Sequence, residues 1–303
     1  MNIGLIIKKA TNELEMSGIK TANLDVILLL EKALKKDRAY ILTHDTEPMT
    51  NSEYSRFRQL IRRRKKGEPI AYILGHKEFY GCDFFVNKNV LIPRPETELI
   101  VENAINYLKS QTSNLKNKEK ISIIDIGTGS GCIIISLMKE IKKTIIHNSS
   151  FIIHLYASDI SKKALYVAKK NARLHKVNNN IRFFYSDLFS NSKMPKKYDL
   201  IIANLPYVPD KITNHKSQIT KNMNGIYFEP KNAIFANNNG TEIIKKFLKQ
   251  AKSRINKDGL ILIEVDPRNS KELLDYSKKL YQNDKIDLIK DLANIDRVIR
   301  ILL

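Results

Sequence analysis

An apolar run at residues 198–203 ends abruptly in the stretch Asn204-Leu205-Pro206-Tyr207. Short apolar runs that are bounded by turn residues are typical of buried strands. Because Pro206 has no backbone N–H to donate to a strand ladder, the strand should stop near Asn204. Ligands of open α/β sheets bind at the carboxyl ends of strands. The stretch therefore predicts a strand end that presents an amide, backbone carbonyls and an aromatic ring to a planar amino group.

The same succession of apolar run and helical segment recurs from residue 121 to the end of the chain. Helical periodicity fills the intervals between the apolar runs. Strands that alternate with helices in this way build a doubly wound parallel sheet, so the sequence predicts an α/β fold. Further strands are predicted at residues 121–126, 151–158, 181–185 and 260–265, with apolar stretches at 286–289 and 298–303 completing the sheet.

Residues suited to ligand binding follow three of these predicted strands. Gly127-Thr128-Gly129-Ser130-Gly131 lies between the first strand and a helix, where glycines let the backbone approach a ligand closely. Asp159 follows the second strand and suits a ribose diol, although a solvated turn is the alternative; Asp187 follows the third strand. The loop and Asp159 are farther apart than the usual roughly 20 residues, and we expect residues 141–150 to bulge away from the site. A glycine loop alone suits NAD, flavin or S-adenosylmethionine (AdoMet).

The N-terminal part of the chain has a different pattern. Residues 1–72 show helical periodicity and predict a small helical bundle, in which Asn51 could cap one helix. Residues 73–98 predict a β-hairpin and a proline-rich linker, and residues 99–303 form the sheet-containing domain. The basic residues 62–66 either complement a helix dipole or form a docking surface for an acidic partner.

Two segments flank the predicted site. The linker around Arg94 and Glu96 is either a plain connection or a cover over the active site. Residues 208–224 are polar and lack apolar periodicity, and such long segments in compact domains are usually functional. We expect this second segment to be a lid that faces the substrate.

The formal net charge of +20 admits a nucleic acid or an acidic protein as a partner. We favour a general bias toward Lys, Asn and Ile, because the lysines occur throughout the predicted helices and loops without interleaved aromatic residues. The two cysteines suit a reducing compartment, and the six scattered histidines predict no metal site. No apolar run reaches the roughly 18 residues of a membrane span, and the N-terminus lacks the pattern of a secretory signal. A cytoplasmic location is therefore predicted.

Taken together, the glycine loop, Asp159, Asp187 and Asn204-Leu205-Pro206-Tyr207 resemble the sites of class I AdoMet-dependent methyltransferases. Longer stretches resemble the family that methylates a glutamine side chain of peptide-chain release factors. The linker motif with its prolines and Glu96 is the family-specific part. The similar stretches lie at residues 67–75, 92–98, 125–131, 159–172, 227–230 and 291–298.

The resemblance implies a Rossmann-like, mostly parallel sheet with an antiparallel edge strand, and it implies roles for particular residues. AdoMet would be converted to S-adenosylhomocysteine without a metal ion. The substrate glutamine would be bound by Asn204, Leu205, Pro206 and Tyr207, which also form the catalytic group, with Arg94 and Glu96 nearby. The implied cofactor contacts are Gly127, Thr128, Gly129, Ser130 and Gly131 for the methionine part, Asp159 for the ribose, Asp187 and Leu188 for the adenine, and Asn204.

The implied function is methylation of the side-chain N5 of a glutamine in class I release factors, which modulates translation termination. A monomer that requires neither membrane nor nucleic acid is expected, with the N-terminal bundle recognising the protein substrate. Two departures from the family pattern are Leu205, where Pro is usual, and Glu264-Val265-Asp266-Pro267, where the family tends to have a glycine after the Glu. Asn-Leu-Pro-Tyr also occurs in enzymes that dimethylate adenine in ribosomal RNA, so an N6-adenine methyltransferase that acts on RNA or DNA is the alternative. A non-catalytic module that binds AdoMet or a protein is a third hypothesis.

Overall fold

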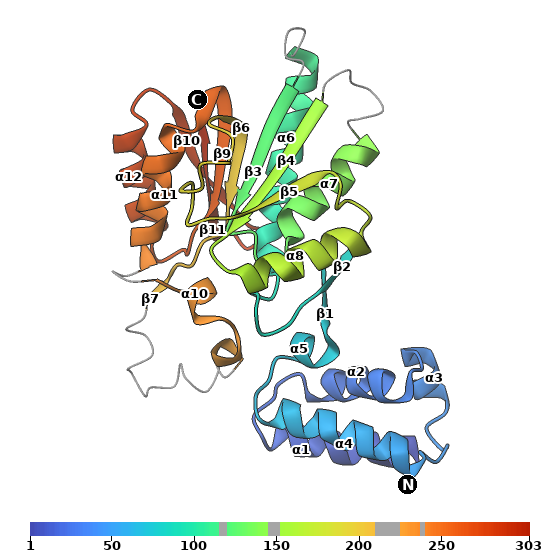
Figure 1. Ribbon diagram of the computed structural model, residues 1–303. Coiled ribbons are helices and arrows are strands. Elements are labelled where there is room, and N and C mark those ends of the chain that lie inside the picture. The colour runs from blue at the N-terminus through green and yellow to red at the C-terminus, as the bar shows by residue number, and fades with distance from the viewer. Residues whose placement is uncertain (115–119, 145–151, 210–224, 237–239) are drawn as a thin grey trace. The chain divides into compact units, whose positions relative to one another are not determined.

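The computed structural model describes residues 1–114, 120–144, 152–209, 225–236 and 240–303. The chain divides into two compact units (Figure 1). The first comprises Met1–His76 and Gln218–Phe228, and the second comprises Lys77–Ser217 and Glu229–Leu303. Within the described part, no helix is long and apolar enough to cross a membrane.

The first unit is helical, and its helices enclose a core that includes Leu14, Leu29 and Phe57. Thr50, rather than the predicted Asn51, caps the fourth helix, because its side chain and that of Glu53 form a reciprocal capping box. The helices are α1 (Ile3–Glu15), α2 (Ala22–Leu34), α3 (Arg38–Thr43), α4 (Asn51–Lys65) and α5 (Ile70–Leu74).

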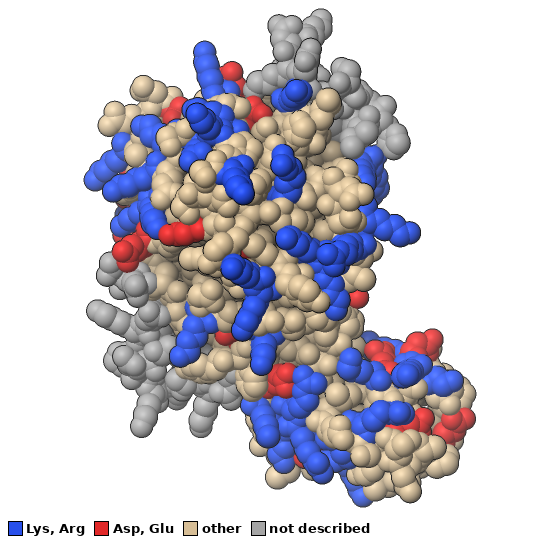
Figure 2. Space-filling view, in the orientation of Figure 1, with Lys and Arg blue, Asp and Glu red and all other residues tan. Residues whose placement is uncertain are grey.

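Basic residues of the run on α4 form ion pairs within the first unit. Arg63 pairs with Glu68 at 2.6 Å, and Arg64 pairs at 2.6 Å with Asp25, whose side chain is only 3% exposed. Elsewhere, Lys and Arg side chains are scattered over the visible face of the molecule rather than gathered in one patch (Figure 2). Both observations agree with a charge that is distributed over the chain.

The second unit is built on a seven-stranded sheet with the order β10-β11-β9-β6-β3-β4-β5, which confirms the predicted fold class (Figure 1). One detail differs from the expectation: β11 is antiparallel to both neighbours and lies between β9 and the edge strand β10. The strands are β3 (Lys120–Ile126), β4 (Ile152–Asp159), β5 (Ile181–Tyr185), β6 (Tyr198–Ala203), β9 (Ile255–Glu264), β10 (Lys285–Lys290) and β11 (Asp296–Leu302).

Side-chain alternation along the central strands divides the core into two layers. On β6, Leu200 and Ile202 pack on one face with α6, α7 and α8, whereas Ile201 and Ala203 pack on the other with α11 and α12. All four residues are fully buried, as expected for a strand covered on both sides. The helices are α6 (Glu98–Asn114), α7 (Cys132–Thr144), α8 (Lys162–Leu174), α11 (Glu242–Lys252) and α12 (Ser270–Leu280).

Short elements complete the two units. β1 (His76–Phe79) and β2 (Cys82–Phe85) form the predicted hairpin, and Tyr80 and Gly81 alone connect the two strands. The linker forms a short helix, η1 (Pro95–Thr97), directly before α6. Of the predicted lid, Val208–Pro209 forms β7, paired with β8 (Phe235–Ala236), and residues 210–224 lie outside the described part of the chain. The remaining short elements are η4 (Ile226–Phe228) and α10 (Lys231–Ile234).

Candidate active site

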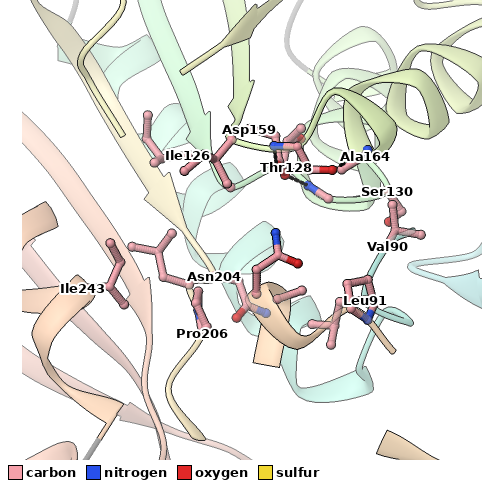
Figure 3. Close-up of a pocket in the computed structure, with 18 of the residues that line it drawn as sticks. Val90, Leu91, Ile126, Thr128, Ser130, Asp159, Ala164, Asn204, Pro206 and Ile243 are labelled. Carbon is pink, nitrogen blue, oxygen red and sulfur yellow. Dashed lines mark hydrogen bonds between the residues drawn. The ribbon is translucent and has the colours of Figure 1, made fainter. Parts of the chain in front are cut away.

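A cavity of about 450 Å³ lies in the second unit, where β3, β4 and β6 end (Figure 3). This volume is within the range of small-molecule and cofactor sites, about 300–1,000 Å³. The ends of the parallel strands supply Ile126, Asp159 and Asn204 to its wall. Most residues predicted for the site line it, namely Arg94, Gly127, Thr128, Gly129, Ser130, Asp159, Asp187, Leu188, Asn204, Leu205 and Pro206.

Different structural constraints explain why the loop after β3 has a glycine at each of three positions. Gly127 has φ +76°, and a Cβ there would lie 3.0 Å from Cδ2 of Leu205. Gly129 has φ +55°, and a Cβ there would only come within 3.9 Å of the Gly127 carbonyl oxygen. Because Gly129 lines the cavity, its backbone is accessible to a ligand. Gly131 does not line the cavity: its Cβ would lie 2.9 Å from Ile135 Cδ1 and 3.2 Å from Ala168 Cβ. The third glycine thus permits packing between α7 and α8.

Asp159 ends β4 and fixes the glycine loop. Its Oδ2 accepts the backbone N–H of Gly129 at 2.9 Å, and its Oδ1 accepts that of Ser161 at 2.8 Å. Burial raises the pKa of this carboxyl, and the two backbone hydrogen bonds oppose the rise. Each carboxylate oxygen retains capacity for another hydrogen bond, which matches the two hydroxyl donors of a ribose. The residue chemistry and the cavity size therefore fit a nucleoside cofactor.

Asp187 and Leu188 follow β5 and also line the cavity. The Asp187 carboxylate pairs with Nζ of Lys246 at 2.8 Å, and both side chains are nearly half exposed. Leu188 is buried in the core and adopts a left-handed backbone conformation with φ 48°. The charged group therefore lies at the rim, and the leucine provides an apolar wall.

The Asn204 side chain has a defined orientation. Its Nδ2 donates to Oε2 of Glu264 at 2.9 Å and to Oγ1 of Thr97 at 3.1 Å. Within the described chain, Asn204 Oδ1 and the Leu205 carbonyl receive no hydrogen bond from the protein. Two acceptors on cavity-lining residues are thus available where β6 ends.

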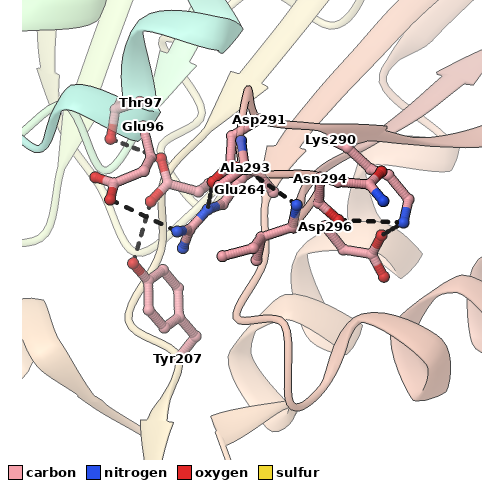
Figure 4. A network of polar contacts seen from close by, with 11 residues as sticks. Glu96, Thr97, Tyr207, Glu264, Lys290, Asp291, Ala293, Asn294 and Asp296 are labelled. Carbon is pink, nitrogen blue, oxygen red and sulfur yellow. Dashed lines mark hydrogen bonds and ion pairs between the residues drawn. The ribbon is translucent and has the colours of Figure 1, made fainter.

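Other predicted site residues are held by neighbours. The hydroxyl of Tyr207 donates to Oε1 of Glu264 at 3.1 Å (Figure 4). The Tyr207 ring is not part of the cavity wall. Glu96 also lies off the wall and pairs with Arg297 at 3.6 Å. Arg94 reaches the cavity while pairing with Glu229 at 2.7 Å.

Sequence reasoning missed three residues that organise this site: Thr97, Glu229 and Glu264. The sequence contained a signal for Glu264. Like Asn204, it is a polar residue at the end of an apolar run. No group of three or more His, Cys, Asp or Glu among the described residues is arranged to hold a metal ion.

Comparisons with known proteins identify both parts of the chain. Residues 6–75 match the family model of the PrmC N-terminal domain, and residues 109–225 match the methyltransferase small domain. A solved structure, the hMettl16 catalytic domain in complex with the MAT2A 3′UTR hairpin 6, aligns with a TM-score of 0.54 and 14% identity. The alignment covers 80% of this chain and 81% of that one, and shows a shared fold. Fold and site define a class I methyltransferase.

Two curated relatives extend over nearly the whole chain. The release factor glutamine methyltransferase of Buchnera aphidicola is 35% identical, with 98% of this chain and 97% of the relative covered. That of Rhodopirellula baltica is 32% identical, with 97% and 94% covered. The chain belongs to the release factor glutamine methyltransferase family. It is also 33% identical over 99% of its length to the bifunctional methyltransferase of Rickettsia typhi, of which it spans only 57%.

Proposed function

We propose that this protein transfers a methyl group from AdoMet to the side-chain N5 of a glutamine in a class I peptide-chain release factor. The observation that carries the proposal is the orientation of Asn204. Its Nδ2 is occupied by Glu264 and Thr97, so its Oδ1 remains to accept a hydrogen from a planar amino group. The Leu205 carbonyl offers a second acceptor for the other hydrogen.

The chemistry of an amide explains why two acceptors matter. The nitrogen lone pair of a primary amide is delocalised into its carbonyl, so the nitrogen is a weak nucleophile. Hydrogen bonds from its two N–H groups to Asn204 and Leu205 would increase the electron density on nitrogen and fix its direction of attack. Positioning of this kind can contribute up to about 7–11 kcal/mol in favourable cases. Leu205 can replace the usual Pro in this role, because the group required is a backbone carbonyl.

The cavity residues have the donors and acceptors that AdoMet needs. Asp159 would accept the ribose hydroxyls, Leu188 would pack on the adenine, and the open backbone of Gly129 would face the methionine part. When bound, AdoMet supplies an electrophilic methyl group on a sulfonium. The chain's own part in the reaction is to hold the acceptor nitrogen through Asn204 and Leu205.

We further propose that the N-terminal helical unit, residues 1–72, recognises the release factor and that residues 73–98 link it to the methyltransferase domain, residues 99–303. The match of residues 6–75 to the PrmC N-terminal domain supports this division. The enzyme is proposed to act as a cytoplasmic monomer that needs no nucleic acid.

The test uses purified protein, radiolabelled AdoMet and either a class I release factor or unmodified ribosomal RNA. We expect label in the release factor, on a glutamine that mass spectrometry identifies by a mass gain of one methyl group. The Asn204→Ala variant should transfer label far more slowly than the wild type while still binding AdoMet. Label that appeared only in RNA would instead support the adenine methyltransferase. If the Asn204→Ala protein kept its full role in the cell, a binding module would be supported.

A further inference from the structure

Glu264 is a buried carboxylate beside the cavity that the sequence did not assign to the reaction. It ends β9, and the residue is only 3% exposed. Three side chains donate to it: Thr97 Oγ1 and Asn204 Nδ2 to its Oε2, at 2.6 and 2.9 Å, and the Tyr207 hydroxyl to its Oε1, at 3.1 Å. Figure 4 shows Thr97 and Tyr207 converging on this carboxylate.

The directions of these hydrogen bonds determine one another. Thr97 has a single hydroxyl hydrogen, and it is directed to Glu264, so the Thr97 oxygen can only accept from Asn204. Both groups that face the inner end of the Asn204 amide are therefore acceptors. That end must be the nitrogen, because an oxygen there would place lone pairs against a carboxylate.

We propose that Glu264 is a positioning residue that holds the Asn204 amide with Oδ1 toward the substrate nitrogen and increases the strength of that acceptor. The inference rests on the proposed function only for the identity of the substrate. A hydrogen bond from Nδ2 to a carboxylate polarises the Asn204 amide and increases the electron density on Oδ1. A rotated amide would instead present N–H groups to the N–H groups of the substrate and leave no acceptor.

The same carboxylate joins three parts of the domain. Thr97 comes from the proline-rich linker, Asn204 and Tyr207 from the segment after β6, and Glu264 from β9. The linker residue that touches Asn204 is thus Thr97, between the motif's Glu96 and the start of α6. The contribution of the linker to catalysis is, on this view, to supply an acceptor for Asn204.

The ionisation of Glu264 provides a readout. Burial raises the pKa of this carboxyl, as does the charge of Glu96, whereas hydrogen bonds from Thr97 and Tyr207 and the charge of Arg297 lower it. The carboxylate is present above its pKa. Acidification should therefore decrease kcat through a group with a pKa above that of an ordinary Glu.

The decisive variant is Glu264→Gln, which preserves size but cannot accept hydrogen bonds at both terminal atoms. We expect kcat to fall by about 100-fold, comparable to losing one catalytic hydrogen-bond partner, with the AdoMet dissociation constant within about twofold because the Asp159 side of the cavity is intact. The acid limb of the kcat profile should disappear. In an Asn204→Ala background, Glu264→Gln should have no additional effect on kcat.

A matched control is Asp199→Asn. Asp199 is also a buried carboxylate on a central strand, and it accepts Ser122 N–H and Asn256 Nδ2, but it does not line the cavity. Its variant should lose stability and keep kcat. A Glu264→Gln enzyme with kcat within about threefold of wild type, or additive effects in the double variant, would overturn the proposal.

Two further measurements separate this inference from the proposed function. Side-chain amide signals of Asn204 in the 15N-labelled protein, assigned by their absence in Asn204→Ala, should exchange slowly with solvent, whatever the substrate is. Fast exchange in the wild type would refute the positioning role.

If Glu264→Gln does not fold, Thr97→Val removes one acceptor from Nδ2 with little change of shape, and kcat should still fall. If the wild type methylates RNA instead of a release factor, the same kcat comparison applies to that substrate.

Discussion

Arg94 donates from Nη2 to Oε1 of Glu229 at 2.7 Å, across a sequence separation of 135 residues. The Glu229 carboxylate also accepts the backbone N–H of Ile92 at 3.0 Å, and its side chain is only 3% exposed. This pair joins the proline-rich linker to the segment that precedes α10. Since Arg94 also lines the cavity, the ion pair determines the shape of one cavity wall.

Replacing Arg94 by Ala should leave a buried carboxylate with one remaining donor. We expect a loss of about 2 kcal/mol in the free energy of unfolding, the usual cost of depriving a buried charged group of a partner. AdoMet binding should weaken as well, because the linker wall is no longer fixed. Chemical denaturation and calorimetry measure the two effects. Arg94→Lys keeps the charge and should lose less; equal stability of Arg94→Ala and wild type would contradict the prediction.

Replacing Asp159 by Ala should weaken AdoMet binding by more than about tenfold, since the variant loses the acceptor for hydroxyl groups and the anchor of the Gly129 N–H. Calorimetric titration with AdoMet measures the affinity. Asp287→Ala is the control, because Asp287 lies on β10 and pairs with Arg300. An unchanged affinity for Asp159→Ala would mean that the ribose is bound elsewhere.

Asp125 should make stability depend on pH. Its side chain is fully buried, and its Oδ1 has no hydrogen-bond partner among the described residues. Burial raises the pKa of this carboxyl to about 7. The unfolded chain has a pKa of about 3.9, so between these values the folded state retains a proton that the unfolded state releases. The contribution of this group to stability therefore falls as pH rises toward 7.

Asp125→Asn cannot ionise and keeps an acceptor for the Thr128 hydroxyl, which donates to the Asp125 carboxyl at 2.6 Å. The variant should gain stability relative to the wild type when both are moved from about pH 5 to about pH 8. Thermal unfolding at the two pH values tests this. An equal difference in Tm at both would show that Asp125 does not titrate in this window.

Gly240 should tolerate no side chain. It has φ +84°, and a Cβ would collide with the carbonyl of Tyr207. Gly240→Ala should therefore displace the segment after Asn204 and decrease both Tm and kcat. Gly18→Ala is a matched control, because Gly18 has φ +79° with nothing within 4 Å of the added Cβ. Similar Tm losses in the two variants would show that backbone strain, rather than the collision, is responsible.

Several elements could be predicted because their signals are local. β5 and β6 have the predicted bounds of 181–185 and 198–203, since each is a mainly apolar run that ends at turn or polar residues. The cap of α4 was placed one residue too late, because Thr50 and Asn51 are both good caps and only the Glu53 side chain decides between them. The position of β11 inside the sheet depends on pairing with β9 and β10, which no local pattern specifies.

The sequence by itself determined the order of strands and helices, the α/β class and the residues that stand at strand ends, because alternation of apolar residues and breakers acts over a few residues. Only the tertiary structure decided what those residues face. The Asn204 amide is oriented by Thr97 and Glu264, which are 107 and 60 residues away. Hydrogen-bond direction at a buried amide depends on which acceptors the fold brings to it, and that information exists only once linker, β6 and β9 are packed together.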